Sequence, residues 1–297
     1  ATPHRQHGGY HRPMFSYRHA FHAGNHADVL KHTALIAMVR YLTEKDAALV
    51  VVDTHAGAGL YRLDGDYAEK SGESADGVAR LKGTAELVPA LQDYRDLIAT
   101  FNAKGQMKVY PGSPFIVHQL LREHDRLKLF ELHPTDARAL DGNVAQLEAG
   151  RQIAVFREDG FEGLKKFIPP PSRRALVLCD PSYEIKSDYA RVLAAMTDAL
   201  KRFATGTYAV WYPIIARPEA HDLPRRLKTL ATKSGKSWLN ASLTVKAGKD
   251  ATGLPASGLF VINPPHTLKA QLALALPQMV ELLGQDRNAA FGLDSGG

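Results

Sequence analysis

The sequence has very little cysteine and no apolar stretch long enough to cross a membrane. Cys179 is the only cysteine among 297 residues, which excludes an internal disulfide and a zinc site built from cysteines. No run approaches the roughly 18 to 20 apolar residues that span a bilayer. The first residues, ATPHRQHGGYHRP, have no apolar core of the kind found in secretory signals. We therefore expect a cytoplasmic protein.

Basic residues exceed acidic ones by a modest margin. There are 37 Lys and Arg residues against 31 Asp and Glu, a formal net charge of +6. Such an excess favours a polyanionic partner, because Lys and Arg gain affinity by displacing counterions from phosphates. We expect the partner-facing surface to draw on six cations: Arg18, Lys165, Lys166, Arg173, Arg174 and Lys186.

Short apolar runs alternate with longer amphipathic stretches along the chain. The runs are Ala48–Asp53, Leu127–Glu131, Ile153–Phe156, Ala175–Asp180, Thr207–Pro213, Ser242–Lys246 and Leu259–Asn263. Continuous apolar runs are typical of strands buried on both faces of a sheet covered by helices. The alternation predicts an α/β doubly wound fold with a seven-stranded, mostly parallel sheet.

The spacing of these runs also divides the chain into parts. About seventy residues separate the first two predicted strands, far more than a crossover helix requires, and the amphipathic stretch Thr84–Asn102 predicts a helix there. We therefore assign residues 61–112 to a small helical insert and residues 14–60 and 113–283 to the α/β domain. Residues 1–13 are expected to form a mobile arm and residues 284–297 a frayed tail.

The first predicted strand leads into a glycine-containing loop, Asp53-Thr54-His55-Ala56-Gly57-Ala58-Gly59. In doubly wound folds this loop approaches the cofactor, and glycines such as Gly57 stand where a Cβ atom would collide with it. The loop is not GxGxxG and no phosphate-binding lysine follows, so neither a dinucleotide nor a P-loop site is favoured. It resembles the first motif of class I methyltransferases, with an ordinary strand–helix turn as the alternative.

Acidic residues end the first three predicted strands. Asp53 ends the first, Glu131 the second, and Asp159 follows the third. Ligands bind at such strand ends in open α/β sheets, where Glu131 could accept the ribose hydroxyls of a cofactor and Asp159 its adenine amine. Each acid alone could equally be a solvated helix cap.

The fourth predicted strand ends in Asp180-Pro181-Ser182-Tyr183. This is close to the (Asp/Asn)-Pro-Pro-aromatic motif of amino methyltransferases, with Ser182 in place of the second proline. If Asp180 and the Pro181 carbonyl accept the hydrogens of an aromatic amine, the nitrogen lone pair can leave the ring and attack a methyl donor. Tyr183 would provide a face on which the base stacks. The alternative is a plain strand-terminating turn.

A second segment, Asn263-Pro264-Pro265-His266, matches the first motif positions better. It follows the last predicted strand, however, and only Asp180 leaves room for the three strands that must come after a catalytic loop in this fold. We therefore interpret Asn263–His266 as the start of the last helix.

These motifs and a longer segment, SYRHAFHAGNHADVLKH at residues 16–32, resemble the bacterial 23S ribosomal RNA large subunit methyltransferase J family. The resemblance runs from about Met14 to Pro265 and also includes Tyr110–Pro114 and Lys201–Gly206. It implies a Rossmann-like class I methyltransferase fold with a helical insert. It also implies S-adenosylmethionine-dependent methylation of the exocyclic N6 amine of one adenine in 23S ribosomal RNA, without a metal.

The resemblance also implies roles for individual residues. By motif position it implies cofactor contacts at His32, His55, Ser113, Glu131, Asp159, Gly160 and Asp180, and a substrate contact at Tyr17. From the residues alone, Asn25 reads as the N-cap of a helix that contains His32. Ser113 reads as an N-cap followed by a proline, whose helix could receive the cofactor carboxylate.

Several histidines cluster near the start of the chain: His19, His22, His26, His32 and His55. Their spacing fits no familiar zinc pattern, so we expect no metal. We also expect a monomer. Two other functions stay open: a methyltransferase acting on DNA adenine or on a protein glutamine, and a catalytically inactive RNA-binding relative. Methyl incorporation into RNA, DNA and protein would separate them.

Overall fold

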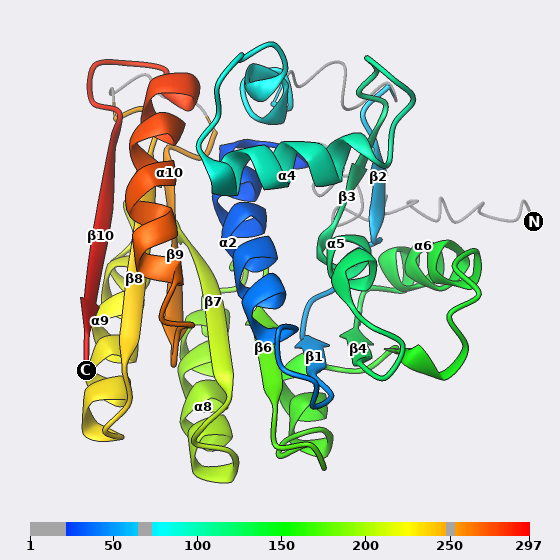
Figure 1. Ribbon diagram of the computed structural model, residues 1–297. Coiled ribbons are helices and arrows are strands. Elements are labelled where there is room, and N and C mark those ends of the chain that lie inside the picture. The colour runs from blue at the N-terminus through cyan, green and yellow to red at the C-terminus, as the bar shows by residue number, and fades with distance from the viewer. Residues whose placement is uncertain (1–21, 65–72, 248–252) are drawn as a thin grey trace, which may run out of the picture.

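The computed structural model describes residues 22–64, 73–247 and 253–297 and is built around an eight-stranded sheet (Figure 1). The strands lie in the order β10-β8-β9-β7-β6-β1-β4-β5. Along the chain they are β1 (Val50–Asp53), β4 (Arg126–Phe130), β5 (Ile153–Phe156), β6 (Ala175–Cys179), β7 (Thr207–Ile214), β8 (Trp238–Thr244), β9 (Ala256–Ile262) and β10 (Ala290–Gly296). The seven predicted strands are all present, and β10 is an eighth.

The sheet is wound in two directions from its centre. β1 pairs in parallel with β4 on one side and with β6 on the other, and β5 and β7 extend the parallel part outward. β9, β8 and β10 complete the sheet with antiparallel pairs. Successive strands are therefore added outward in opposite directions from the boundary between β1 and β6. Ligands bind at such a switch point, beyond the carboxyl ends of the strands.

Helices cover both faces of the sheet. One face carries α2 (His26–Leu42), α5 (Ser113–Leu120), α6 (Pro134–Ala145) and α10 (Leu268–Leu283), and the other carries α7 (Gly160–Gly163), α8 (Ser187–Arg202) and α9 (Pro218–Lys233). Short 3-10 helices are η1 (Val78–Leu81), η2 (Gly150–Gln152) and η3 (Leu164–Lys166). In β6, Leu178 packs into one core and Cys179 into the other, as the alternation of a strand requires.

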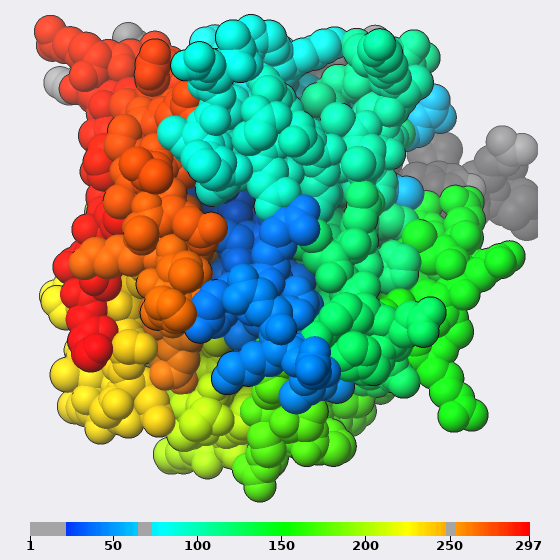
Figure 2. Space-filling view, in the orientation of Figure 1, coloured from blue at the N-terminus to red at the C-terminus, as the bar shows by residue number. Residues whose placement is uncertain are grey.

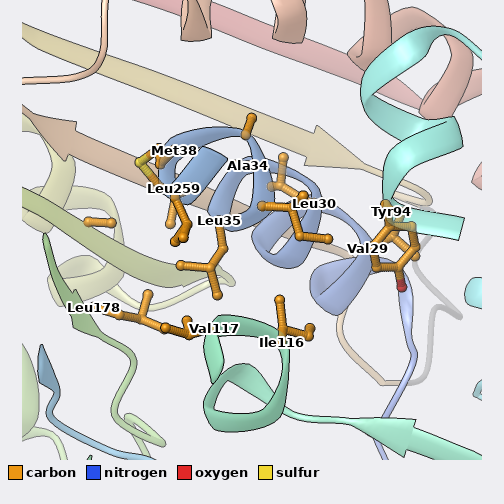
Figure 3. Close-up of a cluster of buried hydrophobic side chains, with 14 of the residues drawn as sticks. Val29, Leu30, Ala34, Leu35, Met38, Tyr94, Ile116, Val117, Leu178 and Leu259 are labelled. Carbon is orange, nitrogen blue, oxygen red and sulfur yellow. The ribbon is translucent and has the colours of Figure 1, made fainter. Parts of the chain in front are cut away.

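Helix α2 is buried in the first of these cores. Asn25 caps it as predicted, its side chain accepting the Asp28 backbone N–H at 3.0 Å. A helix that is apolar on most sides must be surrounded by protein, and Figure 3 shows Leu30 and Leu35 of α2 among side chains from α5, β6 and β9. This packing fixes the amino-terminal end of α2 beside the carboxyl ends of the strands.

The insert after β1 contains more than helix. It holds α4 (Pro89–Ala99) together with a two-stranded antiparallel sheet of β2 (Leu60–Arg62) and β3 (Val109–Pro111). Tyr94 of α4 is fully buried. Helix α4 is shorter than the predicted Thr84–Asn102, because it begins at Pro89, a residue that favours the first turn of a helix. Figure 2 shows the insert, in cyan and teal, covering one end of α2.

The carboxyl-terminal segment is not a frayed tail, so that prediction is wrong. β10 pairs along its whole length with β8, and Leu293 packs against the core. This strand is held by main-chain hydrogen bonds at a sheet edge, which a polar, glycine-rich sequence does not reveal. Among the described residues, no helix has the length and hydropathy of a membrane span.

Candidate active site

A cavity of about 350 Å³ opens at the carboxyl ends of the parallel strands. Its walls come from the start of α2, the loop after β1, the start of α5, the loop after β6 and the end of β7. Seven of the predicted site residues line it: His32, His55, Gly57, Ser113, Asp180, Pro181 and Tyr183. Glu131, Asp159 and Gly160 are not among its lining residues, although Glu131 accepts a hydrogen bond from Gly57, which is. Tyr17 falls outside the described residues.

Glu131 joins the end of β4 to the glycine loop. Its carboxylate accepts the Gly57 N–H at 2.9 Å and the His133 N–H at 3.0 Å. Gly57 has φ 68° and lines the cavity, and a Cβ atom there would overlap the Tyr61 hydroxyl. Glu131 therefore holds the loop in a shape that leaves main-chain groups beside the cavity, with carboxylate lone pairs to spare for a ligand hydroxyl.

We predict that Glu131→Ala weakens S-adenosylmethionine binding by roughly 1.5–3 kcal/mol, the scale of a hydrogen bond to a charged group. Titration calorimetry with the purified protein measures this. The exposed Glu123 lies away from the cavity, so Glu123→Ala is the control and should bind as the wild type does. An unchanged Kd for Glu131→Ala would remove Glu131 from the site.

Asp159 and Gly160 bring the β5 end against the β1 end. Asp159 caps α7 by accepting the Phe161 N–H at 3.0 Å and also forms an ion pair with Arg191. The Phe161 ring lies 4.7 Å from the His55 ring, which lines the cavity. A Cβ atom on Gly160 would overlap the Thr54 carbonyl oxygen. Only glycine allows the two loops this close approach.

Asp53 is buried beneath the cavity rather than exposed to it. It accepts a hydrogen bond from the Ser113 hydroxyl at 2.5 Å, and burial raises the pKa of Asp53 to about 7, although the Ser113 bond opposes the rise. The predicted cap is therefore corrected by one residue. Gly112 is the N-cap of α5 and Ser113 is its first residue, because the Ser113 hydroxyl is committed to Asp53.

His32 lines the cavity from inside α2 and leads into a buried hydrogen-bond chain. Its Nδ1 lies 2.7 Å from the Tyr110 hydroxyl, which lies 2.9 Å from the Tyr94 hydroxyl of the insert. Burial lowers the pKa of His32 to about 4. The imidazole is therefore neutral at physiological pH, and the chain ties the cavity wall to the insert.

This pKa predicts a pH dependence of stability. The unfolded chain binds a proton at His32 near its ordinary pKa of 6.5 and the folded protein only near 4, so unfolding is favoured as pH falls through that window. The contribution of the neutral His32 to the free energy of unfolding is fully present above about pH 6.5. Below that pH, the free energy of unfolding falls by up to about 1.4 kcal/mol per pH unit. Urea unfolding at pH 7 and 5 should show a smaller pH difference for His32→Gln than for the wild type. Tyr110→Phe keeps the imidazole and should keep the difference. An undiminished difference in His32→Gln would contradict this assignment.

Asp180 follows β6 and is held by a lysine of α2. Its Oδ2 forms an ion pair with the Lys31 ammonium, which also lies 3.2 Å from Asp28. The Lys31 and Asp180 side chains are only 13% and 18% exposed, so solvent screens the pair weakly. Burial alone would lower the pKa of Lys31, but Asp180 and Asp28 together raise it above its usual value. Among the described residues, no hydrogen bond reaches Asp180 Oδ1.

Tyr183 shapes the loop after Asp180. It has φ 57°, and its hydroxyl donates to the Trp211 carbonyl at 2.6 Å. The ring packs beside Tyr189 and Trp211 and is 2% exposed. In this structure Tyr183 is thus part of the cavity floor, and its predicted stacking on a base stays a prediction. Ser182, which stands where the motif has its second proline, is exposed on the loop.

Asn263 lies at the opposite end of the parallel strands, beside the start of β7. β9 runs antiparallel to β7, and Ile262 at its end pairs with Tyr208 at the start of β7. Asn263 donates to the Ala204 and Gly206 carbonyls at 2.9 and 2.8 Å, fixing the turn before β7. The interpretation of this segment as the approach to the last helix, α10, is confirmed by its position.

The predicted basic surface does not surround the cavity. Lys165, Lys166 and Lys186 pair with Glu162, Glu158 and Glu219, respectively. Arg174 donates to main-chain carbonyls. Neither these four residues nor Arg173 lines the cavity, and Arg18 lies outside the described residues. Among the described residues, the lysine and arginine side chains that do line it are Lys31 and Arg217.

Sequence reasoning missed Lys31, Trp211 and Arg217. Lys31 stands within the segment that carries the resemblance, next to His32, but its partner Asp180 is 149 residues away. Trp211 and Arg217 belong to no motif. Across the described residues, no three His, Cys, Asp or Glu side chains gather closely enough to hold a metal ion.

Known proteins resemble this chain over most of its length. A family model described as ribosomal RNA large subunit methyltransferase D, RlmJ, matches residues 46–291. Ribosomal RNA large subunit methyltransferase J of Escherichia coli K12 is 44% identical over 264 residues, which are 89% of this chain and 92% of that protein. The Haemophilus influenzae protein of the same name is 41% identical and covers 91% and 94%, respectively.

The fold agrees as well. The crystal structure of protein LPL1258 from Legionella pneumophila has a TM-score of 0.83 at 32% identity, covering 93% of this chain and 98% of that one. The Rossmann-like α/β fold is therefore confirmed, with eight strands in place of seven. The family model and the sequence matches, which span about nine-tenths of each relative, show that the chain belongs to the ribosomal RNA large subunit methyltransferase J family.

Proposed function

We propose that this protein methylates the exocyclic N6 amine of one adenine in 23S ribosomal RNA, with S-adenosylmethionine as methyl donor. One observation carries the proposal most directly. Asp180, in an amino-methyltransferase motif, lines a cavity at the switch point of the sheet with one carboxylate oxygen paired to Lys31. The family's name supplies the class of substrate.

The residues around the cavity fit the methyl donor. Glu131 and the Gly57 loop provide a carboxylate and a side-chain-free main-chain segment, and the start of α5 lies at the cavity wall. A helix start attracts a carboxylate such as that of a methionine moiety. The cavity volume of about 350 Å³ falls in the range of small-ligand sites. When bound, S-adenosylmethionine would supply an electrophilic methyl group on a sulfonium.

Asp180 would act on the target amine. The lone pair of an aromatic amine is delocalised into the ring, so the nitrogen must become more tetrahedral to attack. Asp180 Oδ1 and the Pro181 carbonyl can accept the two amine hydrogens and favour that geometry. The carboxylate also stabilises the positive charge that grows on the nitrogen, an interaction stronger in the transition state than in the ground state. The new N–C bond would form as the S–C bond of the donor breaks, and the methylated nitrogen would then lose one proton to solvent.

Lys31 would orient this carboxylate. Because Lys31 binds Oδ2, it would hold the Asp180 side chain in one orientation and leave Oδ1 to accept a hydrogen of the target amine. Asp28 shares the Lys31 charge, which keeps the ammonium from cancelling the negative charge of Asp180 completely. The three groups together form a fixed, net negative arrangement beside the reacting amine.

The test is methyl incorporation from radiolabelled S-adenosylmethionine into deproteinised 23S RNA, genomic DNA and a protein extract, with and without EDTA. We expect label in the RNA alone, and no effect of EDTA, since the described residues form no metal cluster. Label in DNA or protein would favour the alternative methyltransferases. No label anywhere, with intact RNA binding, would favour the inactive relative.

We further propose that the protein acts as a monomer in the bacterial cytoplasm. The cavity walls described above all come from one chain, and the proposed substrate is a ribosomal RNA. Sedimentation velocity at micromolar concentration should give a single species near 32.5 kDa, and a dimer would contradict the first part.

A further inference from the structure

The cavity has a cofactor side and a substrate side. In the sheet order, β1, β4 and β5 lie on one side of β6 and β7 lies on the other. The groups proposed for the methyl donor follow β1, β4 and β5, and Asp180 follows β6. The target base must therefore reach Asp180 from the β7 side.

The β7 side of the cavity is largely apolar and ends at one arginine. Trp211, Pro213 and Ile215 all line the cavity, because alternate residues of a strand point to the same face. Two residues further along, Arg217 also lines it and is the N-cap residue of α9. The wall thus offers flat, apolar contact for a base and then a positive charge.

Arg217 differs from the other cation of the cavity in its partners. Lys31 is bound by two carboxylates, Asp180 and Asp28. Within the described part of the chain, Arg217 forms no ion pair with a carboxylate. One of its N–H groups donates to the Tyr183 carbonyl at 3.1 Å, and its side chain also interacts with that of Tyr189. Glu219, in the same helical turn, is paired with Lys186 at 2.9 Å.

We propose that Arg217 binds a backbone phosphate of the nucleotide whose base enters the cavity. This inference rests on the proposed function, since it takes the substrate to be RNA. A base drawn out of its stack carries its flanking phosphates to the mouth of the pocket. A guanidinium has five N–H donors in a planar fork that matches a phosphate, and the contacts with the Tyr183 carbonyl and the Tyr189 side chain leave donors for a ligand.

The bond to Tyr183 gives the contact a second consequence. Tyr183 belongs to the loop that begins at Asp180, so the phosphate-binding side chain and the catalytic loop are mechanically joined. A phosphate bound by Arg217 would lie beside the loop that begins at Asp180, in the same cavity. A merely structural arginine would act on the loop alone, and this difference makes the proposal testable.

The experiment compares Arg217→Ala and Arg217→Lys with Lys233→Ala, which removes a charge from the other end of α9. Fluorescence titration with deproteinised 23S RNA is run over a range of salt concentrations, and single-turnover methylation is measured at saturating RNA. We expect Arg217→Ala to weaken RNA binding about 10-fold or more and to reduce the slope of log K against log salt by about 1. Arg217→Lys should keep the slope, and Lys233→Ala should bind RNA as the wild type does. The affinity for S-adenosylmethionine should be unchanged in all three variants.

Two results would overturn the proposal. One is methylation by the wild type together with wild-type RNA affinity and salt slope in Arg217→Ala. This result would overturn the phosphate contact alone, and a slower rate of that variant at saturating RNA would mean that Arg217 only positions the loop. The other is absence of RNA methylation by the wild type, in which case the proposed function fails together with this inference.

Discussion

Asp180→Ala should lose roughly 10²- to 10³-fold or more in the single-turnover rate of methyl transfer, the scale for deleting one preorganised group at a reacting atom. The substitution removes the acceptor for the amine hydrogen and the charge that stabilises the developing ammonium. Substrate binding should change less, because the interaction strengthens on the way to the transition state. The fold should survive, because Asp28 remains beside Lys31 as a counter-charge.

Two further variants make this result specific. Asp180→Asn should be milder than Asp180→Ala, since the amide oxygen still accepts one hydrogen. Asn263→Ala should cost stability, because two carbonyls of the turn before β7 lose their donor, yet keep a near wild-type rate. An inactive Asn263→Ala together with an active Asp180→Ala would contradict the assignment of the active site to the carboxyl end of β6.

Gly160→Ala should weaken S-adenosylmethionine binding by about 10-fold or more and destabilise the fold by about 1–3 kcal/mol, as over-packing usually does. The added methyl group would overlap the main chain of Thr54, and neither loop can move as a flexible side chain would. Separating them shifts Asp159 from the β1 loop and so deforms the cofactor side. Calorimetric titration and thermal unfolding measure the two effects.

Gly142→Ala is the matched control for this substitution. Gly142 lies in α6, and a Cβ atom there would meet nothing within 4 Å. Alanine in a helix is more favourable than glycine by roughly 0.5–1 kcal/mol, so this variant should be slightly more stable and bind the cofactor normally. Equal behaviour of the two alanine variants would contradict the close approach of the loops.

The parts of the fold that could be predicted from the sequence are those in which burial imposes an apolar pattern. Strands covered on both faces must be apolar, so the strands ending at Asp53 and Asp180 could be predicted from their apolar runs. The position of these acids at the ligand-binding end of the sheet followed from the topology of parallel sheets. β10 left no such pattern, because its order comes from pairing with β8 at an edge. Main-chain hydrogen bonds are the same for every sequence that can make them.

Some of the site residues could be predicted because they belong to local sequence motifs. Motifs that stand next to one another along the chain revealed Asp180 and Gly57. The Lys31–Asp180 pair joins α2 to the β6 end across 149 residues, and no local pattern records such a contact. The environment of Tyr183 also depends on tertiary packing, since its hydroxyl is held by Trp211 of β7. Three-dimensional packing therefore decides which motif residues face the cavity.

The most direct test of the central claim is to identify the methylated nucleoside. Deproteinised 23S RNA is treated with the protein and labelled S-adenosylmethionine, digested to nucleosides and separated by liquid chromatography with mass detection. The proposed chemistry predicts N6-methyladenosine as the single labelled product, absent when Asp180→Ala replaces the wild type. Label on another atom of adenine, on another base or on a ribose would contradict the role given to Asp180.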